Sequence, residues 1–282
     1  MEALVVAPDG SWLAAGGYGG EVRIWDLATG TVRHTITTQT SEVSVLVVAP
    51  DGSWLAYADW YGEVRIWDPV TGTVRRTFTG HTGTVEALVV APDGSWLAAA
   101  AGGYSGEVWI WDVATGITRH ILTGHTSGVK ALAVAPDGSW LASADWYGDV
   151  RIWDPVTGTV RHTFTDHTGT VRALAVAPDG SWLASAGWDG EVRIWDLVAG
   201  IVRHTLIGHT NTVTALTVAS DGSWLATAGY DGEIRVWEPT TGAPLTSLRV
   251  ADRLSHLVLA ATTIAAAGER GSYFLTLCPG NP

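Results

Sequence analysis

The sequence predicts an all-β protein built from repeated, four-stranded antiparallel sheets. The first observation is the stretch Gly-Glu-Val-Arg-Ile-Trp-Asp at 190–196, whose tryptophan recurs every 42 residues with one interval of 44. The second is that turn sequences separate short apolar-polar alternations within each unit, as in antiparallel strands. The third is that a sheet of one unit cannot cover both of its apolar faces alone. Radial stacking of the sheets is therefore expected.

The unit at 42–78 illustrates how each element is assigned. Its four expected strands are 43–48, 53–58, 63–67 and 73–78. The sequence Ala-Pro-Asp-Gly at 49–52 is a turn, because proline presets φ and glycine accepts a positive φ. A tight turn at 60–62 and an Asp-Pro turn at 68–72 separate the remaining strands. The fourth strand is rich in Thr, Arg and His, a polarity that protects an outer edge from pairing with other molecules.

Composition limits the classes of function. The formal net charge of −12 disfavours non-specific binding to nucleic acid or to an anionic membrane. The longest apolar run, 257–267, is too short for a membrane helix. Met1 leads directly into repeat sequence without a signal peptide, so a cytoplasmic location is expected. The single cysteine, Cys278, excludes an internal disulfide.

The repeats resemble those of WD-repeat β-propellers, and in particular bacterial WD-repeat proteins. Trp-Asp or Trp-Glu closes six units, and Gly-His precedes three of the first strands, at 80–81, 124–125 and 208–209. The resemblance implies one domain over 1–282, a seven-bladed propeller of four-stranded antiparallel blades. Six regular repeats lie in 1–250, a degenerate seventh blade with three strands covers about 251–277, and a tail follows at 278–282.

The same resemblance implies a structural network in each blade, made by a loop His, a strand Ser or Thr, a turn Asp and the Trp. Two blades carry every member: His167, Ser185, Asp189 and Trp195, and then His209, Thr227, Asp231 and Trp237. Other blades depart from the pattern. Gln39 replaces the His, Ala99 replaces the Ser, and the Asp position holds Gly19, Tyr61, Ser105 or Tyr147. The network is expected to be partial in those blades.

The two ends of the chain suggest a hypothesis about its origin. Met1 stands where other units have the valine that opens the first strand, and few residues follow 277. Neither end supplies a fourth strand for the seventh blade. The sequence therefore suggests the C-terminal part of a longer protein, or a reading frame begun at an internal Met.

No constellation of catalytic or metal-binding residues interrupts the repeat. Eight of the nine histidines recur at two repeat positions, which indicates structural roles. The glycine-rich stretch at 101–106 precedes a strand and lacks the lysine of a phosphate-binding loop. No cofactor and no metal are expected, and Cys278 has no histidine near it in the sequence.

Candidate binding residues lie on one rim, where the resemblance places the tight turns and the loops before the first strands. An aromatic residue recurs in the turns: Tyr18, Trp60, Tyr104, Trp146, Trp188 and Tyr230. Beside them, early in the first strand, the repeats differ most: Glu2, Ser44, Glu86, Lys130, Arg172 and Thr214. Tyr and Trp favour binding interfaces, whereas the alternative readings are packing for the aromatic residues and drift for the variable position.

These observations favour a non-catalytic scaffold or sensor that binds a protein or peptide on this rim. The resemblance places it as a monomeric module within a larger bacterial signalling protein, with no nucleic-acid or membrane partner. The alternative is a propeller that binds a glycan or small ligand through the aromatic residues. An enzyme with a site in the central channel is the third hypothesis.

Overall fold

The computed structural model describes residues 3–17, 19–38, 42–80, 83–103, 105–260 and 263–276. These residues form seven separate antiparallel sheets, six with four strands and the last with three. The fold class predicted from the sequence, an all-β seven-bladed propeller with a three-stranded seventh blade, is confirmed. Across this described part, the structure contains no helix of the length and apolarity needed to cross a membrane.

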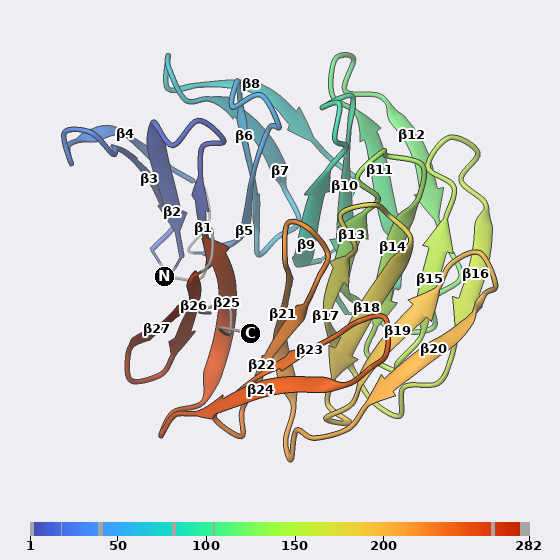
Figure 1. Cartoon of the computed structure of the whole chain (residues 1–282). Helices are drawn as coiled ribbons and strands as arrows, with labels where there is room; N and C mark the ends of the chain where they lie inside the picture. Colours follow the sequence, from blue (N-terminus) through green and yellow to red (C-terminus); the bar gives the residue numbers. More distant parts are fainter. Residues whose placement is uncertain are drawn as a thin grey trace. The chain divides into compact units, whose positions relative to one another are not determined.

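Two compact units divide the chain, Met1–Ser143 with Trp153–Val160, and Ala144–Ile152 with Arg161–Pro282. The first unit contains the first three blades, whose strands follow one another in sequence order (Figure 1). They are β1 (Ala3–Val6), β2 (Trp12–Gly16), β3 (Glu21–Asp26) and β4 (Val32–Thr37); β5 (Val43–Val48), β6 (Leu55–Asp59), β7 (Val64–Asp68) and β8 (Thr73–Phe78); β9 (Val85–Val90), β10 (Trp96–Ala101), β11 (Val108–Asp112) and β12 (Thr118–Leu122).

The fourth blade carries the boundary between the units, and the second unit holds the last three blades. The fourth blade consists of β13 (Val129–Val134), β14 (Leu141–Asp145), β15 (Val150–Trp153) and β16 (Val160–Phe164). The last three blades are β17 (Val171–Val176), β18 (Trp182–Gly187), β19 (Val192–Asp196) and β20 (Ile201–Leu206); β21 (Val213–Val218), β22 (Leu225–Gly229), β23 (Glu233–Trp237) and β24 (Pro244–Arg249); β25 (Leu254–Ala260), β26 (Thr263–Gly268) and β27 (Ser272–Thr276).

Strand boundaries in the second blade agree with the sequence prediction at β5 and β8 but shift at β6 and, by one residue, at β7. The second strand begins at Leu55, because the backbone N–H of Ser53 donates to the Asp51 carboxylate and keeps Ser53 in the turn. The strand continues to Asp59, which accepts backbone hydrogen bonds from the next turn. Side-chain hydrogen bonds of this kind compete with strand pairing.

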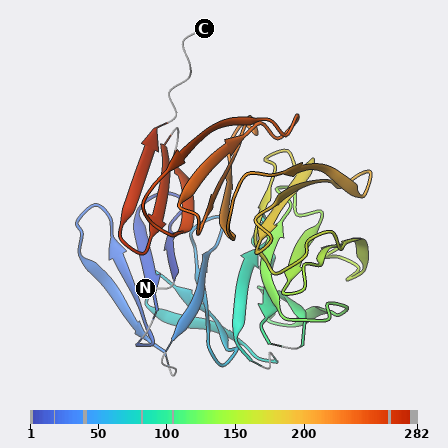
Figure 2. The same cartoon turned by 90° about the horizontal axis from the view of Figure 1, so that it is seen from below.

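Within each unit, neighbouring blades bury their apolar faces against one another. Trp54 of the second blade joins Val85, Leu97 and Trp111 of the third in one core cluster. In the second unit, Trp182 of the fifth blade joins Leu225 and Trp237 of the sixth. The sixth and seventh blades pack in the same way, through β21 and β25 (orange to red in Figure 2). Trp54 and Trp182, which each follow a serine after the first turn of their blade, thus serve packing between blades.

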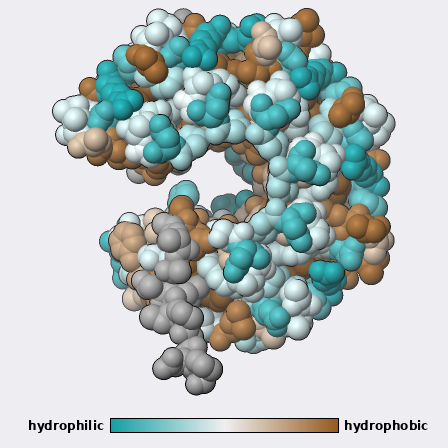
Figure 3. Space-filling view, turned by 45° about the horizontal axis from the view of Figure 1, so that its top comes forward, coloured by the Kyte–Doolittle hydropathy of each residue, from teal (hydrophilic) through white to brown (hydrophobic). Residues whose placement is uncertain are grey.

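Outer strands add a second contact between neighbouring blades. The imidazole Nε2 of His34, His120 and His204 donates to the carbonyl oxygens of Val70, Val156 and Thr240, at 3.1, 2.9 and 2.8 Å. Each of these carbonyls lies in the turn between the third and fourth strands of the following blade. The recurring outer-strand histidines therefore have a structural function. Figure 3 shows hydrophobic side chains dispersed among hydrophilic ones on the surface in view.

The turn that joins the first two strands of the fourth blade offers a clean test of backbone preference. Gly138 has φ of 73°, and a Cβ added there would meet only Pro92, at an ordinary contact distance of 3.5 Å. Gly138→Ala should therefore cost about 1–2 kcal/mol through the left-handed conformation alone. Gly138→Asn should cost less, because asparagine tolerates this region. Chemical denaturation measures both, and an equal loss for the two variants would contradict the explanation.

Candidate functional site

One surface of the second unit is made by tight turns and by the loops that enter the first strands, and we call it the turn face. Each loop contacts the turn of its own blade and the turn of the blade before it. Thr170 donates its hydroxyl to the Trp146 carbonyl at 3.0 Å, and the Thr170 carbonyl accepts the Trp188 N–H at 2.9 Å. The N–H of Val250 donates to the carbonyl of Gly232 at 2.8 Å. This chain of contacts places the turns of blades four to seven side by side.

Tryptophan side chains project from these turns into solvent. Trp146 is 48% exposed and Trp188 is 60% exposed, and Trp60 in the first unit is 53% exposed. Residues of this size are usually much more buried. Tyr230, the next aromatic along the turn face, is half-buried. Tyr18 and Tyr104 lie outside the described residues.

The most variable position of the repeat is the extra residue of a β-bulge. In the second, fifth and sixth blades the pairing of the first strand skips Ser44, Arg172 and Thr214. The third blade skips Glu86 in the same way. A bulged residue does not pair with the neighbouring strand, and its side chain points in a different direction from that of a paired residue. This explains why closely similar repeats differ at this position. Glu2 lies outside the described residues.

The side chains at the bulge positions have different surroundings. Ser44 donates its hydroxyl to the carbonyl of Ala58 at 3.1 Å, within its own blade. The Thr214 hydroxyl lies 3.1 Å from the Ala228 carbonyl of its own blade and 2.7 Å from the Leu254 carbonyl of the seventh blade. Glu86 and Lys130 form an ion pair at 2.6 Å, so these two rim charges of the first unit face each other. Arg172 is exposed, and its guanidinium lies 6.0 Å from the Tyr230 ring centroid.

The fifth blade joins the four residues of the expected structural network. Trp195 Nε1 donates to Ser185 Oγ at 2.8 Å, and Ser185 Oγ lies 2.7 Å from His167 Nε2. His167 Nδ1 lies 2.7 Å from the Asp189 carboxylate. His167 Nδ1 also lies 2.6 Å from the Arg193 guanidinium, which donates to Asp189 at 2.8 Å. Every polar atom in this series has a partner, as buried groups require.

The sixth blade repeats this arrangement with threonine in place of serine. Trp237 Nε1 lies 3.1 Å from Thr227 Oγ1, which lies 2.7 Å from His209 Nε2. His209 Nδ1 lies 2.9 Å from Asp231. Burial lowers the pKa of His209 despite the neighbouring Asp231 carboxylate. A shift in this direction favours the neutral imidazole.

The turn aspartates are held ionised. Burial raises the pKa of Asp189, but the hydrogen bonds from His167, Arg193 and the backbone N–H of Glu191 outweigh burial, so the pKa lies well below its usual 3.8. For Asp231, burial is likewise outweighed by the backbone N–H groups of Thr210 and Glu233 and by His209, and the pKa is lowered. Hydrogen bonds to the charged form produce shifts of this direction.

The second and fourth blades, which lack aspartate at the expected turn position, use a carboxylate from two residues earlier. Asp59 accepts the N–H groups of Tyr61 and Glu63, and Asp145 accepts those of Tyr147 and Asp149. Both aspartates are buried. In the fourth blade His125, Ser143 and Trp153 are linked, at 2.6 and 2.7 Å. In the second blade Tyr57 replaces the serine, and Trp67 Nε1 is buried without a partner in the described part of the chain.

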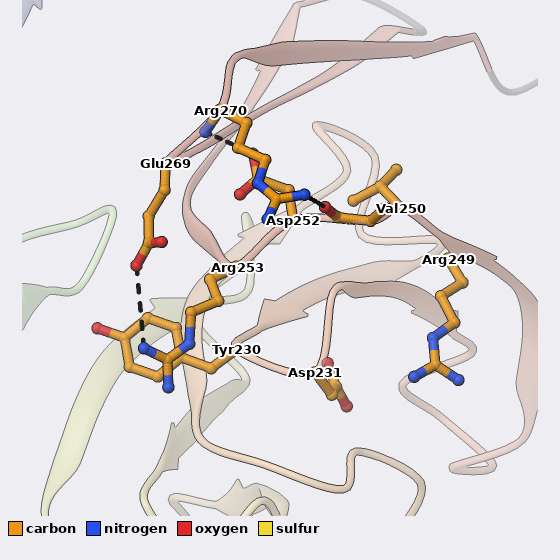
Figure 4. A pocket seen from close by; sticks show the side chains of 9 residues that line it. Tyr230, Asp231, Arg249, Val250, Asp252, Arg253, Glu269 and Arg270 are labelled. Atoms are coloured by element: carbon orange, nitrogen blue, oxygen red, sulfur yellow. Dashed lines mark hydrogen bonds and ion pairs between the residues drawn. The ribbon is translucent and has the colours of Figure 1, made fainter.

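A cavity of about 470 Å³, which was not predicted from the sequence, opens on the turn face of the second unit (Figure 4). It lies between the loop at 249–253 and the turns that carry Tyr230 and Arg270. Arg249, Arg253 and Arg270 line it together with Asp231, Asp252 and Glu269. Most of these residues belong to the degenerate repeat, where the repeat pattern gives no guide to position.

The described residues contain no group of three or more His, Cys, Asp or Glu side chains arranged to hold a metal ion. His167 and His209 are each engaged on both ring nitrogens by the structural network. Cys278 lies outside the described residues. The chemistry that the turn face offers is therefore aromatic contact and charge recognition by arginine.

Comparison with known families agrees with this architecture. The family model described as "WD domain, G-beta repeat" matches residues 2–26, 30–68, 72–112, 116–154, 158–196 and 200–238. These six matches cover most of the chain, so the protein belongs to the WD-repeat family. No curated protein matches the sequence.

The network of the fifth blade predicts a large effect for a small substitution. Ser185→Ala removes the oxygen between Trp195 Nε1 and His167 Nε2 and leaves both nitrogens buried and unpaired. The expected loss of unfolding free energy is about 1–3 kcal/mol for each unpaired group. Ser181→Ala is the matched control, because Ser181 is exposed and its hydroxyl bonds only the exposed Asp179 carboxylate, at 2.7 Å, and it should cost less than about 1 kcal/mol. Equal effects in urea denaturation would show that the network does not stabilise the blade.

The lowered pKa of Asp189 predicts a dependence of stability on pH. A carboxyl group whose pKa is lower in the folded protein contributes stability above its unfolded pKa, and the contribution is lost as pH falls. Below about pH 4, the unfolding free energy of the wild type should fall more steeply with decreasing pH than that of Asp189→Asn. The difference in slope should correspond to up to about one additional proton taken up on unfolding. Unfolding free energies measured between neutral and acidic pH test this. Parallel curves for the two proteins would contradict the assignment.

Proposed function

We propose that the protein is a non-catalytic scaffold or sensor module that binds a protein or peptide on its turn face. The main support is the exposure of Trp146 and Trp188, which present large aromatic surfaces from adjacent turns. Aromatic residues lose little conformational entropy on binding and are over-represented among the energetically dominant residues of interfaces. Family membership supports the same proposal, although fold alone does not fix function.

Three features support recognition over catalysis. Both ring nitrogens of His167 and of His209 take part in structural hydrogen bonds. The exposed aromatic residues occupy equivalent positions in successive repeats, which extends a surface but does not assemble a reaction centre. Arg172, beside Tyr230, differs from its counterparts in the other repeats. Its positive charge would orient a charged partner on this surface.

The proposed setting is a cytoplasmic bacterial signalling protein in which this module acts as a monomeric binding domain. The basic residues are all arginine except Lys130, a usage that fits a GC-rich genome. The net charge of −12 disfavours nucleic acid and anionic membranes as partners. Binding would then bias whichever domain is attached to the module.

Selection of a random peptide library against the purified protein tests the proposal. Recovered peptides should bind Trp146→Ala/Trp188→Ala at least about tenfold more weakly than the wild type, because two exposed aromatic contacts are lost. Phe274→Ala is the matched control, since Phe274 is a 74% exposed aromatic residue on β27, outside the turns. Its binding should stay within about twofold of wild type.

Two outcomes would overturn the proposal. If the library yields no binding peptide while a glycan array yields a ligand that requires the same tryptophans, the glycan alternative is correct. If recovered peptides bind the double tryptophan variant and the wild type equally, the turn face is not the interface. A melting temperature close to wild type for both variants shows that the comparison concerns binding.

A further inference from the structure

The cavity on the turn face is lined by three arginines and three carboxylates. The arginine side chains come from two elements, Arg249 and Arg253 from the ends of the loop between β24 and β25, and Arg270 from the turn between β26 and β27 (Figure 4). A fourth, Arg172, stands at its edge beside Tyr230. Against a net charge of −12, such a cluster needs an explanation beyond solubility.

The acidic residues of the cavity are already engaged. Asp231 accepts hydrogen bonds from His209 and from the N–H groups of Thr210 and Glu233. Asp252 accepts the N–H of Arg270 at 2.9 Å and the hydroxyl of Tyr273 at 3.2 Å. These carboxylates hold backbone and neighbouring side chains in place, so they position the cavity wall. They remain ionised, so the cavity offers an anion the hydrogen-bond donors of its arginines and not a net positive charge.

The arginine side chains are, by contrast, available to a ligand. Within the described part of the chain, the Arg249 guanidinium has no hydrogen bond or ion pair. Arg270 donates from one nitrogen, to the carbonyl of Ala251 at 3.2 Å, and keeps its other donors. Arg253 faces Glu269 at 3.9 Å, and both side chains are more than half exposed, so water weakens this pair.

Tyr230 orders part of this cluster. The Arg253 guanidinium lies 4.9 Å from the Tyr230 ring centroid, within the range of a cation–π contact. The ring restricts the side chain while leaving the hydrogen-bond donors at its edge accessible. Less side-chain freedom is then lost when an anion binds. An arginine fork held in this way matches the two oxygens of a carboxylate or phosphate.

We propose that this cavity binds an anionic side chain, carboxylate or phosphate, of a peptide partner, with Arg249 and Arg270 as its main donors and Arg253 as a third, ordered by Tyr230. The proposal rests on the proposed function, because it names the chemistry of the partner for the same face. Trp146 and Trp188 would contact the remainder of the peptide along the neighbouring turns. The Glu269 carboxylate pairs with Arg253 in the free protein, and the incoming anion replaces it.

Fluorescence anisotropy with labelled peptides of fixed composition tests the charge requirement. The probes are an alternating Glu-Ser peptide, its Gln-Ser counterpart, and a peptide in which phosphoserine supplies the charge. We expect the Glu-Ser or the phosphoserine peptide to bind the wild type, with the tighter of the two identifying the anion, and the Gln-Ser peptide to bind at least about tenfold more weakly. Added salt should weaken binding, as for exposed charges.

Arg249→Gln/Arg270→Gln should reduce binding of the anionic probe by at least about tenfold, because two charge-assisted donors are lost. Arg161→Gln/Arg203→Gln is the matched control, since it removes the same charge from the exposed outer strands β16 and β20. Tyr230→Leu should weaken the probe by a smaller factor through looser placement of Arg253. Equal binding by the two arginine double variants, or no preference of the wild type for the anionic probes, overturns the proposal.

The library-selected peptides separate this proposal from the proposed function. Peptides that depend on Trp146 and Trp188, carry no excess of acidic residues and bind Arg249→Gln/Arg270→Gln normally would retain the peptide-binding function and reject the anion site. Acidic enrichment together with sensitivity to both sets of variants supports the two proposals. Failure to recover any peptide, with binding of the anionic probes intact, would reject the proposed partner class and leave an anion site alone.

Discussion

Burial of apolar sheet faces between neighbouring blades is the constraint on which the rest of the structure depends. Each of the six regular blades has small alanine side chains on its second strand and a tryptophan on its third, and Trp111, Trp153, Trp195 and Trp237 are nearly inaccessible to solvent. A blade of about 42 residues could not protect these faces alone. The repeated sequence is therefore fixed where blades meet, and the hydrogen-bonded histidines hold their loops over the buried tryptophans.

Positions outside the packed faces can vary in sequence without loss of packing between the blades. The turn tryptophans face solvent, and the bulged residue of the first strand escapes the ladder, so both positions accept different side chains without disturbing the stacking. The seventh blade departs furthest from the repeat, and its segment supplies Asp252, Arg253, Glu269 and Arg270 to the cavity. The degenerate repeat thus provides most of the site that we propose for an anion.

The sequence predicted the fold well, because its period, turns and alternation all describe one blade. It also predicted the members of the network in the fifth and sixth blades, since those positions recur. It did not predict that Asp59 and Asp145 cap their turns from a shifted position, because a carboxylate can reach the same N–H groups from two places. The Glu86–Lys130 pair and the arginine cavity depend on contacts between blades, which no local pattern encodes.

We expect the apolar faces of the blades to serve packing alone and the partner to bind on the turn face. Hydrogen–deuterium exchange of the protein, with and without a bound library-selected peptide, tests it most directly. The account predicts slow exchange of the second strands in both states, and peptide-induced protection confined to the turns at 146–148, 188–190, 230–232 and 269–271 and to the loop at 249–253. Protection of the outer strands β16 and β20, with these turns unchanged, would contradict it.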